Sequence, residues 1–306
     1  MNFDHEPVLA REVVELFRSV APRTLVDGTL GGGGHAFALL EALPTLRLIG
    51  IDRDANARAA AAARLAGFGE RVSVHESTFA RTPEVVAELG ESGVDGLLVD
   101  LGVSSHQLDA GERGFSFRAD APLDMRMDQS KGQTAAELIA EVDVHALADI
   151  LWRYGEERQS RRLARAIKSE LPTRTGELAG LIERLMPASR GRIHPATRTF
   201  QALRIAVNDE LGELERWLEA VPSLLNPGGV AAVITFHSLE DRMVKHAFRA
   251  LTEAPSRSKY LPEDSVSLDF EKVFRRAVVA DDDEVLHNPR SRSAKLRAIR
   301  RKGGAP

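Results

Sequence analysis

One glycine-rich stretch constrains the fold of this chain more than any other segment, and it runs over residues 25–35 as LVDGTLGGGGH. A short apolar run ends in an acid, and a loop with five glycines follows before residues 36–43 can start a helix. A strand-to-helix turn needs this much glycine where the backbone must pass close to a ligand, such as a nucleoside or nucleotide cofactor. A tight turn without a ligand is the alternative interpretation.

A second acid lies at the corresponding place in the next predicted strand. Residues 46–52 form an apolar run that ends in Asp52, 19 residues after Gly33. An acid at this spacing can accept hydrogen bonds from the hydroxyls of a ribose. Asp52 could instead cap the Ala-rich helix predicted over 55–65. The two signals together favour a cofactor site over a structural turn.

The pattern of the loop indicates which cofactor it binds. Dinucleotide-binding folds use G-x-G-x-x-G, whereas this loop reads D-x-T-x-G-x-G from Asp27 to Gly33. It resembles the first motif of class I S-adenosylmethionine (SAM) methyltransferases, D/E-x-G-x-G-x-G, with Thr29 in place of the first glycine. A phosphate-binding P-loop is excluded, because no Gly-Lys-Ser/Thr follows.

Composition excludes several classes of protein. The 306 residues contain no cysteine, so disulfides, Cys-ligated zinc and iron–sulfur clusters are absent. Thiol attack on C6 of a pyrimidine, the usual route to C5 methylation, is excluded as well. Methylation of a base would therefore favour a nitrogen. With no cationic leader and no apolar run of membrane-spanning length, the sequence predicts a cytoplasmic protein without a membrane partner.

Basic residues are concentrated in two parts of a chain whose net charge is −4. Residues 153–204 hold twelve Lys and Arg against five Asp and Glu, and residues 290–302 hold seven Lys and Arg with no acid. Basic blocks in an acidic protein indicate a polyanionic partner.

Strand and helix patterns alternate along the chain, which predicts a doubly wound, mostly parallel sheet. The expected strands are 25–27, 46–52, 72–76, 96–100, 229–236, 272–279 and 296–300, and the expected helices that flank them include 7–17 and 239–251. The gap between the fourth and fifth strands is about 100 residues longer than a crossover needs. We therefore expect a discontinuous SAM-binding domain, 1–107 with 207–306, and an inserted helical RNA-substrate domain, 108–206.

The predicted insert is mostly helical, with helices over 134–140, 145–154, 156–171, 177–186 and 196–218. On the third of these, one stripe carries Arg158, Arg161, Arg162 and Arg165, and the opposite stripe carries Leu163, Ile167 and Leu171. A solvated charged face explains such a stripe equally well. Four further arginines shift the balance toward RNA, and they are Arg190, Arg192, Arg198 and Arg204.

Asp100 ends the fourth predicted strand and is the candidate catalytic group. The exocyclic amine of cytosine or adenine is a poor nucleophile, and an acceptor bonded to its N–H would align it for methyl transfer. Asp100 could also bind the cofactor, or simply cap the turn at Gly102. After the fifth strand, His237 faces the same edge of the sheet, although Ser238 and Asp241 also fit a helix capping box. A metal site at Asp120, Asp124 and Asp128 is not expected, because methyl transfer needs no metal.

Ten segments, in order over nearly the whole chain, resemble the bacterial 16S rRNA cytosine-N4 methyltransferases, the MraW/RsmH family. They are HEPVL (5–9), DGTLGGGGH (27–35), GIDRD (50–54), DLGVSSHQLD (100–109), GFSFR (114–118), PLDMRMD (122–128), RTFQALRI (198–205), VNDEL (207–211), TFHSLEDR (235–242) and NPRSRSAKLR (288–297).

The resemblance implies a class I, Rossmann-like α/β fold and SAM-dependent methylation of N4 of one cytidine in the decoding, P-site region of 16S rRNA. It implies 16S rRNA, within the small ribosomal subunit, as the partner. The family's cofactor-binding positions fall on Gly33, Gly34, His35, Asp52, Phe79, Asp100 and Gln107. Phe79 follows the third strand, where it could pack on the adenine.

One departure from related enzymes bears on the chemistry. Many amino methyltransferases carry (Asp/Asn/Ser)-Pro-Pro-aromatic at this strand end, and the chain instead has Asp-Leu-Gly-Val from Asp100. The clamp on the target base is therefore unassigned, as is the catalytic role of Asp100. A methyltransferase of proteins or small molecules, which would not need the basic insert, and a non-enzymatic RNA-binding assembly factor, which would not need Asp52 and the glycine loop, stay open.

Overall fold

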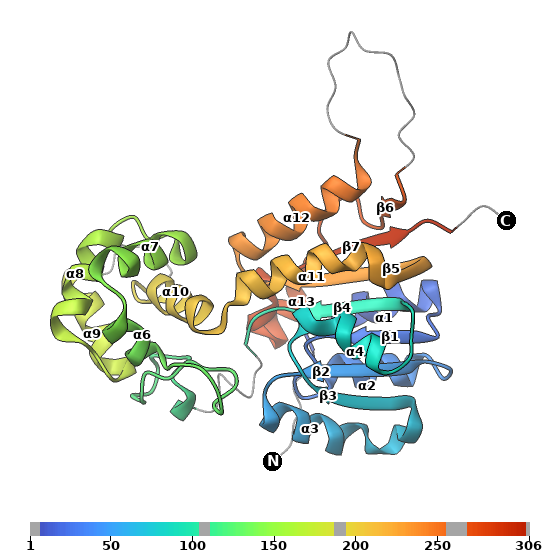
Figure 1. Cartoon of the computed structure of the whole chain (residues 1–306), viewed down its shortest axis with the longest axis horizontal. Coiled ribbons are helices and arrows are strands. Elements are labelled where there is room, and N and C mark those ends of the chain that lie inside the picture. The colour runs from blue at the N-terminus through green and yellow to red at the C-terminus, as the bar shows by residue number, and fades with distance from the viewer. Residues whose placement is uncertain (1–6, 104–110, 187–193, 255–267, 304–306) are drawn as a thin grey trace, which may run out of the picture. The chain divides into compact units, whose positions relative to one another are not determined.

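The computed structural model describes residues 7–103, 111–186, 194–254 and 268–303. It divides into two compact units, 1–102 with 212–306 and 103–211. The first unit is built on a sheet and the second contains helices α6 to α10 (Figure 1). The predicted insert, 108–206, falls inside the second unit. Its assignment as the domain that binds RNA stays a prediction.

The first unit contains a seven-stranded sheet in the order β3-β2-β1-β4-β5-β7-β6. Strands β1 to β5 are parallel to one another, and β7 runs antiparallel to both β5 and β6. The strands are β1 (Thr24–Asp27), β2 (Arg47–Asp52), β3 (Val72–Glu76), β4 (Val94–Asp100), β5 (Leu225–Thr235), β6 (Phe270–Lys272) and β7 (Lys295–Arg301). The predicted class I methyltransferase fold, a Rossmann-like α/β sheet with an inserted helical domain, is confirmed.

Helices cover both faces of this sheet, as the buried strands require. Alternate residues of a strand enter opposite cores: Leu25 packs in one cluster, and its neighbour Val26 in the other. The first core includes residues of α1 (Ala10–Val20), α2 (Gly34–Ala42) and α3 (Ala55–Leu65). The second includes residues of α4 (Thr82–Glu88), α11 (Glu210–Leu224) and α12 (Ser238–Thr252).

The second unit packs its helices around a core of its own. They are α6 (Ala135–Glu141), α7 (Val144–Gly155), α8 (Ser160–Glu170), α9 (Thr175–Leu185) and α10 (Thr197–Asn208). The helix predicted over 156–171 begins only at Ser160, because Glu156 takes the left-handed conformation that ends α7 (φ 49°). Arg158 therefore lies outside α8, and Leu171, predicted on the apolar stripe, is 47% exposed.

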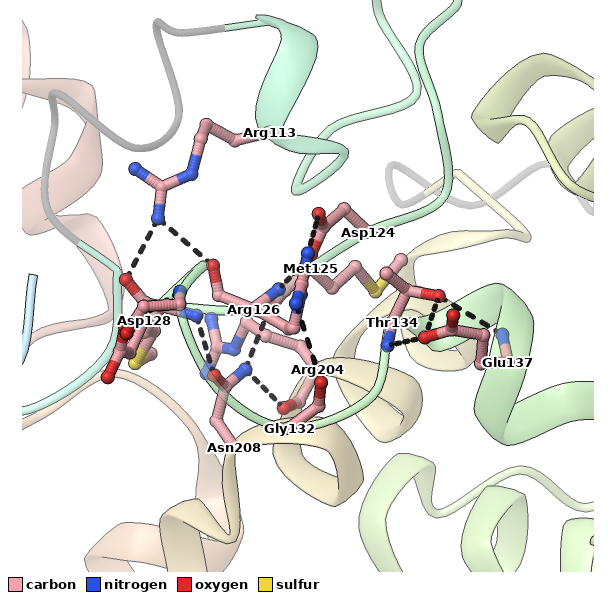
Figure 2. A network of polar contacts seen from close by, with 12 residues as sticks. Arg113, Asp124, Met125, Arg126, Asp128, Gly132, Thr134, Glu137, Arg204 and Asn208 are labelled. Carbon is pink, nitrogen blue, oxygen red and sulfur yellow. Dashed lines mark hydrogen bonds and ion pairs between the residues drawn. The ribbon is translucent and has the colours of Figure 1, made fainter. Parts of the chain in front are cut away.

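The single helix predicted over 196–218 is also wrong. Asp209 has φ 50° and separates α10 from α11. The buried amide of Asn208 holds the end of α10: it donates to the carbonyls of Met125 (2.8 Å) and Arg204 (2.9 Å) and accepts from the Met127 N–H (2.8 Å), as Figure 2 shows. This long-range contact has no counterpart in the helical pattern of the segment.

Two elements of the first unit differ from their predicted limits. The late strand predicted over 272–279 pairs with β7 as a strand only up to Lys272. The chain then touches β7 through the Val273 N–H and again at an isolated bridge of Val278 with Leu296, because residues between them leave the edge of the sheet. The first helix, predicted over 7–17, begins at Ala10, after Leu9 in the left-handed conformation.

None of the helices in the described residues is long and apolar enough to cross a membrane.

Candidate active site

The glycine loop is fixed to the strands on both sides of β1. The Gly28 N–H donates to the Leu98 carbonyl of β4 (2.8 Å), and the Leu30 N–H donates to the Ile51 carbonyl of β2 (2.9 Å). Glycine is required at Gly33, where φ is +76° and a Cβ would lie 3.3 Å from Ala61 of α3. The loop is therefore held at the edge of the sheet by both neighbouring strands.

Helix α2 begins directly behind the loop with no side-chain cap. Its N-cap residue is Gly33, and its first turn contains no acid. The first N–H groups of a helix have no partner within the helix and carry its positive end. In α2 these groups belong to Gly34, His35 and Ala36, so the turn can bind an anionic group of a ligand.

Asp52 ends β2 and supports the loop from the side. One carboxylate oxygen accepts from the Gly31 N–H and the other from the Asp54 N–H, both at 2.8 Å. Burial raises the pKa of Asp52, while these two hydrogen bonds lower it. The alternative role as a helix cap is wrong, because Asp54 caps α3 by accepting from the Asn56 N–H. Each carboxylate oxygen keeps acceptor capacity that a ribose hydroxyl could use.

Asp100 ends β4 on the other side of β1. Its N–H donates to the Thr29 hydroxyl at 2.6 Å, which connects the loop to β4. Its Oδ2 lies 3.8 Å from Nδ1 of the buried His35 ring, and its Oδ1 is buried with no hydrogen-bond partner among the described residues. A buried carboxylate oxygen without a partner is costly, which indicates that a ligand group completes the site.

Acidic groups from three elements meet at this edge of the sheet. Burial raises the pKa of Asp100 well above its usual range, and the nearby carboxyls of Asp27 and Glu240 raise it further. Burial also raises the pKa of Asp27 to about 7, although a hydrogen bond from the Thr29 N–H lowers it. This concentration of carboxyl groups favours a ligand that carries positive charge.

Phe79 is in place but mostly buried. It starts a short 3-10 helix (Phe79–Arg81) after β3 and is 8% exposed. A Cβ on Gly28 would lie 2.9 Å from the Cβ of Phe79 and 2.9 Å from Val99, so glycine at position 28 leaves room for both side chains beside the loop. Contact with an adenine stays a prediction. Gln107, another predicted cofactor residue, lies outside the described residues.

The helix cap after β5 is not the predicted one. His237, rather than Ser238, is the N-cap of α12, and the box closes on Glu240 rather than Asp241. The Glu240 carboxylate accepts from the Phe236 N–H (2.8 Å) and the His237 N–H (3.2 Å). Asp241 instead pairs with Lys295 (2.9 Å) and Arg297 (2.7 Å) of β7. Glu240 thereby joins the acidic group around Asp100, a role that its capping spacing alone does not indicate.

Several of the predicted RNA-binding cations have internal partners. Arg204 forms a two-point ion pair with Glu210, at 2.8 Å for each contact, which removes it from a basic surface. Lys295 and Arg297, from the basic tail, are held by Asp241. Arg161, Arg162 and Arg165 of α8 and Arg198 of α10 are exposed in the second unit. Arg190 and Arg192 lie outside the described residues.

The three acids of the 120–128 segment have partners within the second unit. Asp120 pairs with Arg174 (2.6 Å), and Asp124 with Arg126 (2.8 Å). Asp128 accepts from both the N–H and the hydroxyl of Ser130. Within the described parts of the chain, no group of three His, Cys, Asp or Glu side chains is arranged to hold a metal ion.

Comparison with known proteins gives a match along nearly the whole chain. The sequence model of the MraW methylase family matches residues 2–302. The ribosomal RNA small subunit methyltransferase H of Anaeromyxobacter sp. (strain K) is 52% identical, over 97% of this chain and 98% of that protein. The protein of the same description from Myxococcus xanthus (strain DK1622) is 54% identical, over 97% of each chain. Among solved structures, a putative rRNA methylase from Clostridium thermocellum aligns with a TM-score of 0.42 and 11% identity, over 97% of this chain and 99% of that one.

Proposed function

The chain belongs to the MraW methylase family, and on that premise we propose that it uses SAM to methylate N4 of one cytidine in the decoding, P-site region of 16S rRNA. The relatives described as small subunit rRNA methyltransferases align over nearly their full length, which supports the substrate class. The absence of cysteine supports a nitrogen target, because no thiol is available for covalent attack on the ring.

The residues at the sheet edge fit SAM. The uncapped first turn of α2, at Gly34 and His35, suits the carboxylate of the methionine part, and Asp52 suits the ribose hydroxyls. Phe79 would pack on the adenine. Oδ1 of Asp100, buried and without a partner in the part of the chain that the structure describes, suits a group with positive charge or a donated hydrogen. Bound there, SAM supplies a methyl group on a positively charged sulfur.

Asp100 carries the proposed chemistry. Its side chain is about a quarter exposed, so an amine in the site can reach it while most of the carboxyl stays out of water. As an acceptor of the N4–H hydrogen bond, Asp100 would orient the amine and favour nitrogen attack. The single observation that supports this role most directly is the partly exposed carboxyl at the end of β4, whose Oδ1 has no hydrogen-bond partner among the described residues. The target base would have to leave its stack, which costs least in an irregular region of RNA.

The experiment that tests this function is methyl transfer followed by nucleoside analysis. Labelled SAM is supplied with naked 16S rRNA, assembled small subunits or total protein, and the labelled product is digested. N4-methylcytidine at one rRNA position is expected. Label in protein would favour a protein methyltransferase, failure to bind SAM would favour a non-enzymatic assembly factor, and 5-methylcytidine would contradict the N4 assignment.

Replacing Asp52 by Ala is expected to weaken SAM binding by about 10- to 150-fold, equivalent to about 1.5–3 kcal/mol. The variant loses the proposed ribose acceptor and also releases the N–H of Gly31 in the glycine loop. Calorimetric titration with SAM measures the change. Glu76→Ala is the matched control, since Glu76 ends the neighbouring strand β3 but is exposed and paired with Arg58. Wild-type affinity in Asp52→Ala would contradict the placement of the ribose.

Reversing Arg161 and Arg165 to Glu is expected to weaken rRNA binding and flatten its salt dependence, by about one unit of slope for each phosphate that the variant no longer neutralises. Both arginines lie on the exposed side of α8, and Leu163 and Ile167 on the other side are fully buried. Arg11→Glu with Arg47→Glu makes the same charge change on the sheet unit and serves as the control. An unchanged slope in the α8 variant would identify the stripe as a solvated face.

A further inference from the structure

His35 has one ring nitrogen whose role is fixed by its partner. The ring is buried, with 6% of the side chain exposed, and Nε2 lies 2.8 Å from the carbonyl oxygen of Val8. A carbonyl oxygen only accepts, so Nε2 carries the hydrogen and donates it. In the neutral ring Nδ1 is then an acceptor, and this atom lies 3.8 Å from Oδ2 of Asp100.

Two acceptors that face each other beside a buried ring repel unless one of them binds a proton. The carboxyl groups near Asp100 make this stronger, since Asp27 approaches from β1 and Glu240 from α12. Burial lowers the pKa of His35 to about 4, whereas burial and the two carboxyl groups raise the pKa of Asp100. Of the two groups, Asp100 is therefore the one that holds the proton.

We propose that the His35–Asp100 pair holds one proton in the resting protein and releases it when a cationic methyl donor binds, so that Asp100 becomes a proton acceptor only in the loaded site. The proposal rests on the function proposed above. In this proposal Asp100 is the group that responds to the donor's positive charge. His35 is the positioning residue, because its neutral ring presents the lone pair of Nδ1, rather than a positive charge, to Asp100.

The proton that an amine loses on methylation can be accepted by this pair. The amine nitrogen forms a bond to the methyl carbon, the carbon–sulfur bond breaks with its electron pair left on sulfur, and the amine loses one proton. Asp100 has lost its own proton to solvent when the donor bound, so it can accept the proton that the amine loses. Because the sulfur is then neutral, nothing opposes the protonated acid, and the pair returns to its resting state.

This mechanism predicts that the site distinguishes the donor from its demethylated product by proton release. The two ligands share the adenosine and the amino acid group and differ in the charge on sulfur. The donor should expel the proton of the pair, whereas S-adenosylhomocysteine should leave it in place. Donor affinity should then rise by up to about tenfold per pH unit relative to product affinity, over the range in which the free pair is protonated.

The test is calorimetric titration of the full-length protein with SAM and with S-adenosylhomocysteine at pH 7, in buffers of low and high ionisation enthalpy such as phosphate and Tris. The dependence of the observed heat on buffer gives the number of protons released. About one proton more is expected for SAM than for S-adenosylhomocysteine. Asp100→Asn should remove this difference, because an amide holds no ionisable proton, and His35→Gln should reduce it while keeping a donor near the Val8 carbonyl.

Glu76→Gln is the matched control, since it removes an exposed carboxylate from the end of β3 and should keep the difference of one proton. Equal proton release with the two ligands, or an unchanged difference in Asp100→Asn, would overturn the inference while leaving SAM binding and the proposed function intact. No binding of either ligand to the wild-type protein would overturn the proposed function, and the inference with it.

Discussion

Replacing Asp100 by Asn is expected to lower the rate of methyl transfer to rRNA by about 10²-fold or more, the usual scale for acid–base assistance. The amide keeps the shape of the side chain and leaves the main-chain N–H of residue 100 free to donate to the Thr29 hydroxyl, so the loop should stay in place. What it lacks is a carboxylate that can accept the amine proton. The loss should therefore appear in turnover at saturating SAM.

Single-turnover methyl transfer, measured together with calorimetric SAM affinity, separates the two roles open to Asp100. A fall in rate with little change in affinity indicates the acceptor role, and a parallel loss of both indicates that Asp100 mainly holds the cofactor. Asp95→Asn removes an acid from the opposite end of the same strand, where it accepts from Arg23, Thr24 and Asn226, and should leave the rate unchanged. Normal turnover in Asp100→Asn would remove this residue from the mechanism.

The parts of the fold that the sequence predicted are those whose signals are local. Buried parallel strands appear as apolar runs, and their polar ends mark the edge of the sheet, so Asp27, Asp52 and Asp100 could be placed there from the sequence alone. The glycine loop was predictable for the same reason, because a backbone turn of this kind requires residues without side chains.

The errors arose where distant segments decide the local structure. The break at Asp209 depends on a buried Asn208 that holds a loop more than eighty residues earlier in the chain. The start of α8 depends on the left-handed residue that ends α7, and any polar residue can adopt that conformation at a cost that tertiary packing offsets. Periodicity alone continues a helix through both positions.

The residues around Asp100 illustrate a second limit. Thr29 was visible only as a departure from a glycine motif, yet its hydroxyl connects the loop to β4. Glu240 was missed because Asp241 also fits a capping box, and only the pairing of Asp241 with β7 excludes it. The number of arginines indicated the charge of the segment but not which arginines are free to bind RNA. Ion pairs such as Arg204 with Glu210 depend on contacts made in the folded chain.

The last prediction uses the buried acid at the end of β1. Asp27 is 2% exposed, and burial raises its pKa from 3.8 to about 7. Between these two values the folded chain keeps a proton that the unfolded chain releases, so the free energy of unfolding falls as the pH rises. The contribution amounts to about 3 kcal/mol between pH 5 and pH 8, at about 1.4 kcal/mol per pH unit below the folded pKa.

Asp27→Asn is therefore expected to unfold at a higher urea concentration than the wild type at pH 8, and to show a smaller loss of stability between pH 5 and pH 8. Its amide oxygen can still accept from the Thr29 N–H. Fluorescence follows the sheet unit well, because Trp217 of α11 is 1% exposed, whereas the other tryptophan, Trp152, is 56% exposed. Asp95→Asn is the control. Burial raises the pKa of Asp95, but its hydrogen bonds outweigh burial and lower the pKa below the usual value, so its contribution to stability is lost only as the pH falls through that lowered pKa. The dependence of stability on pH above pH 5 should therefore match the wild type. If the free energy of unfolding of Asp27→Asn changed with pH as steeply as that of the wild type, the Asp27 carboxyl would be ionised in the folded state. The acidic group around Asp100 would then carry more negative charge than its burial predicts.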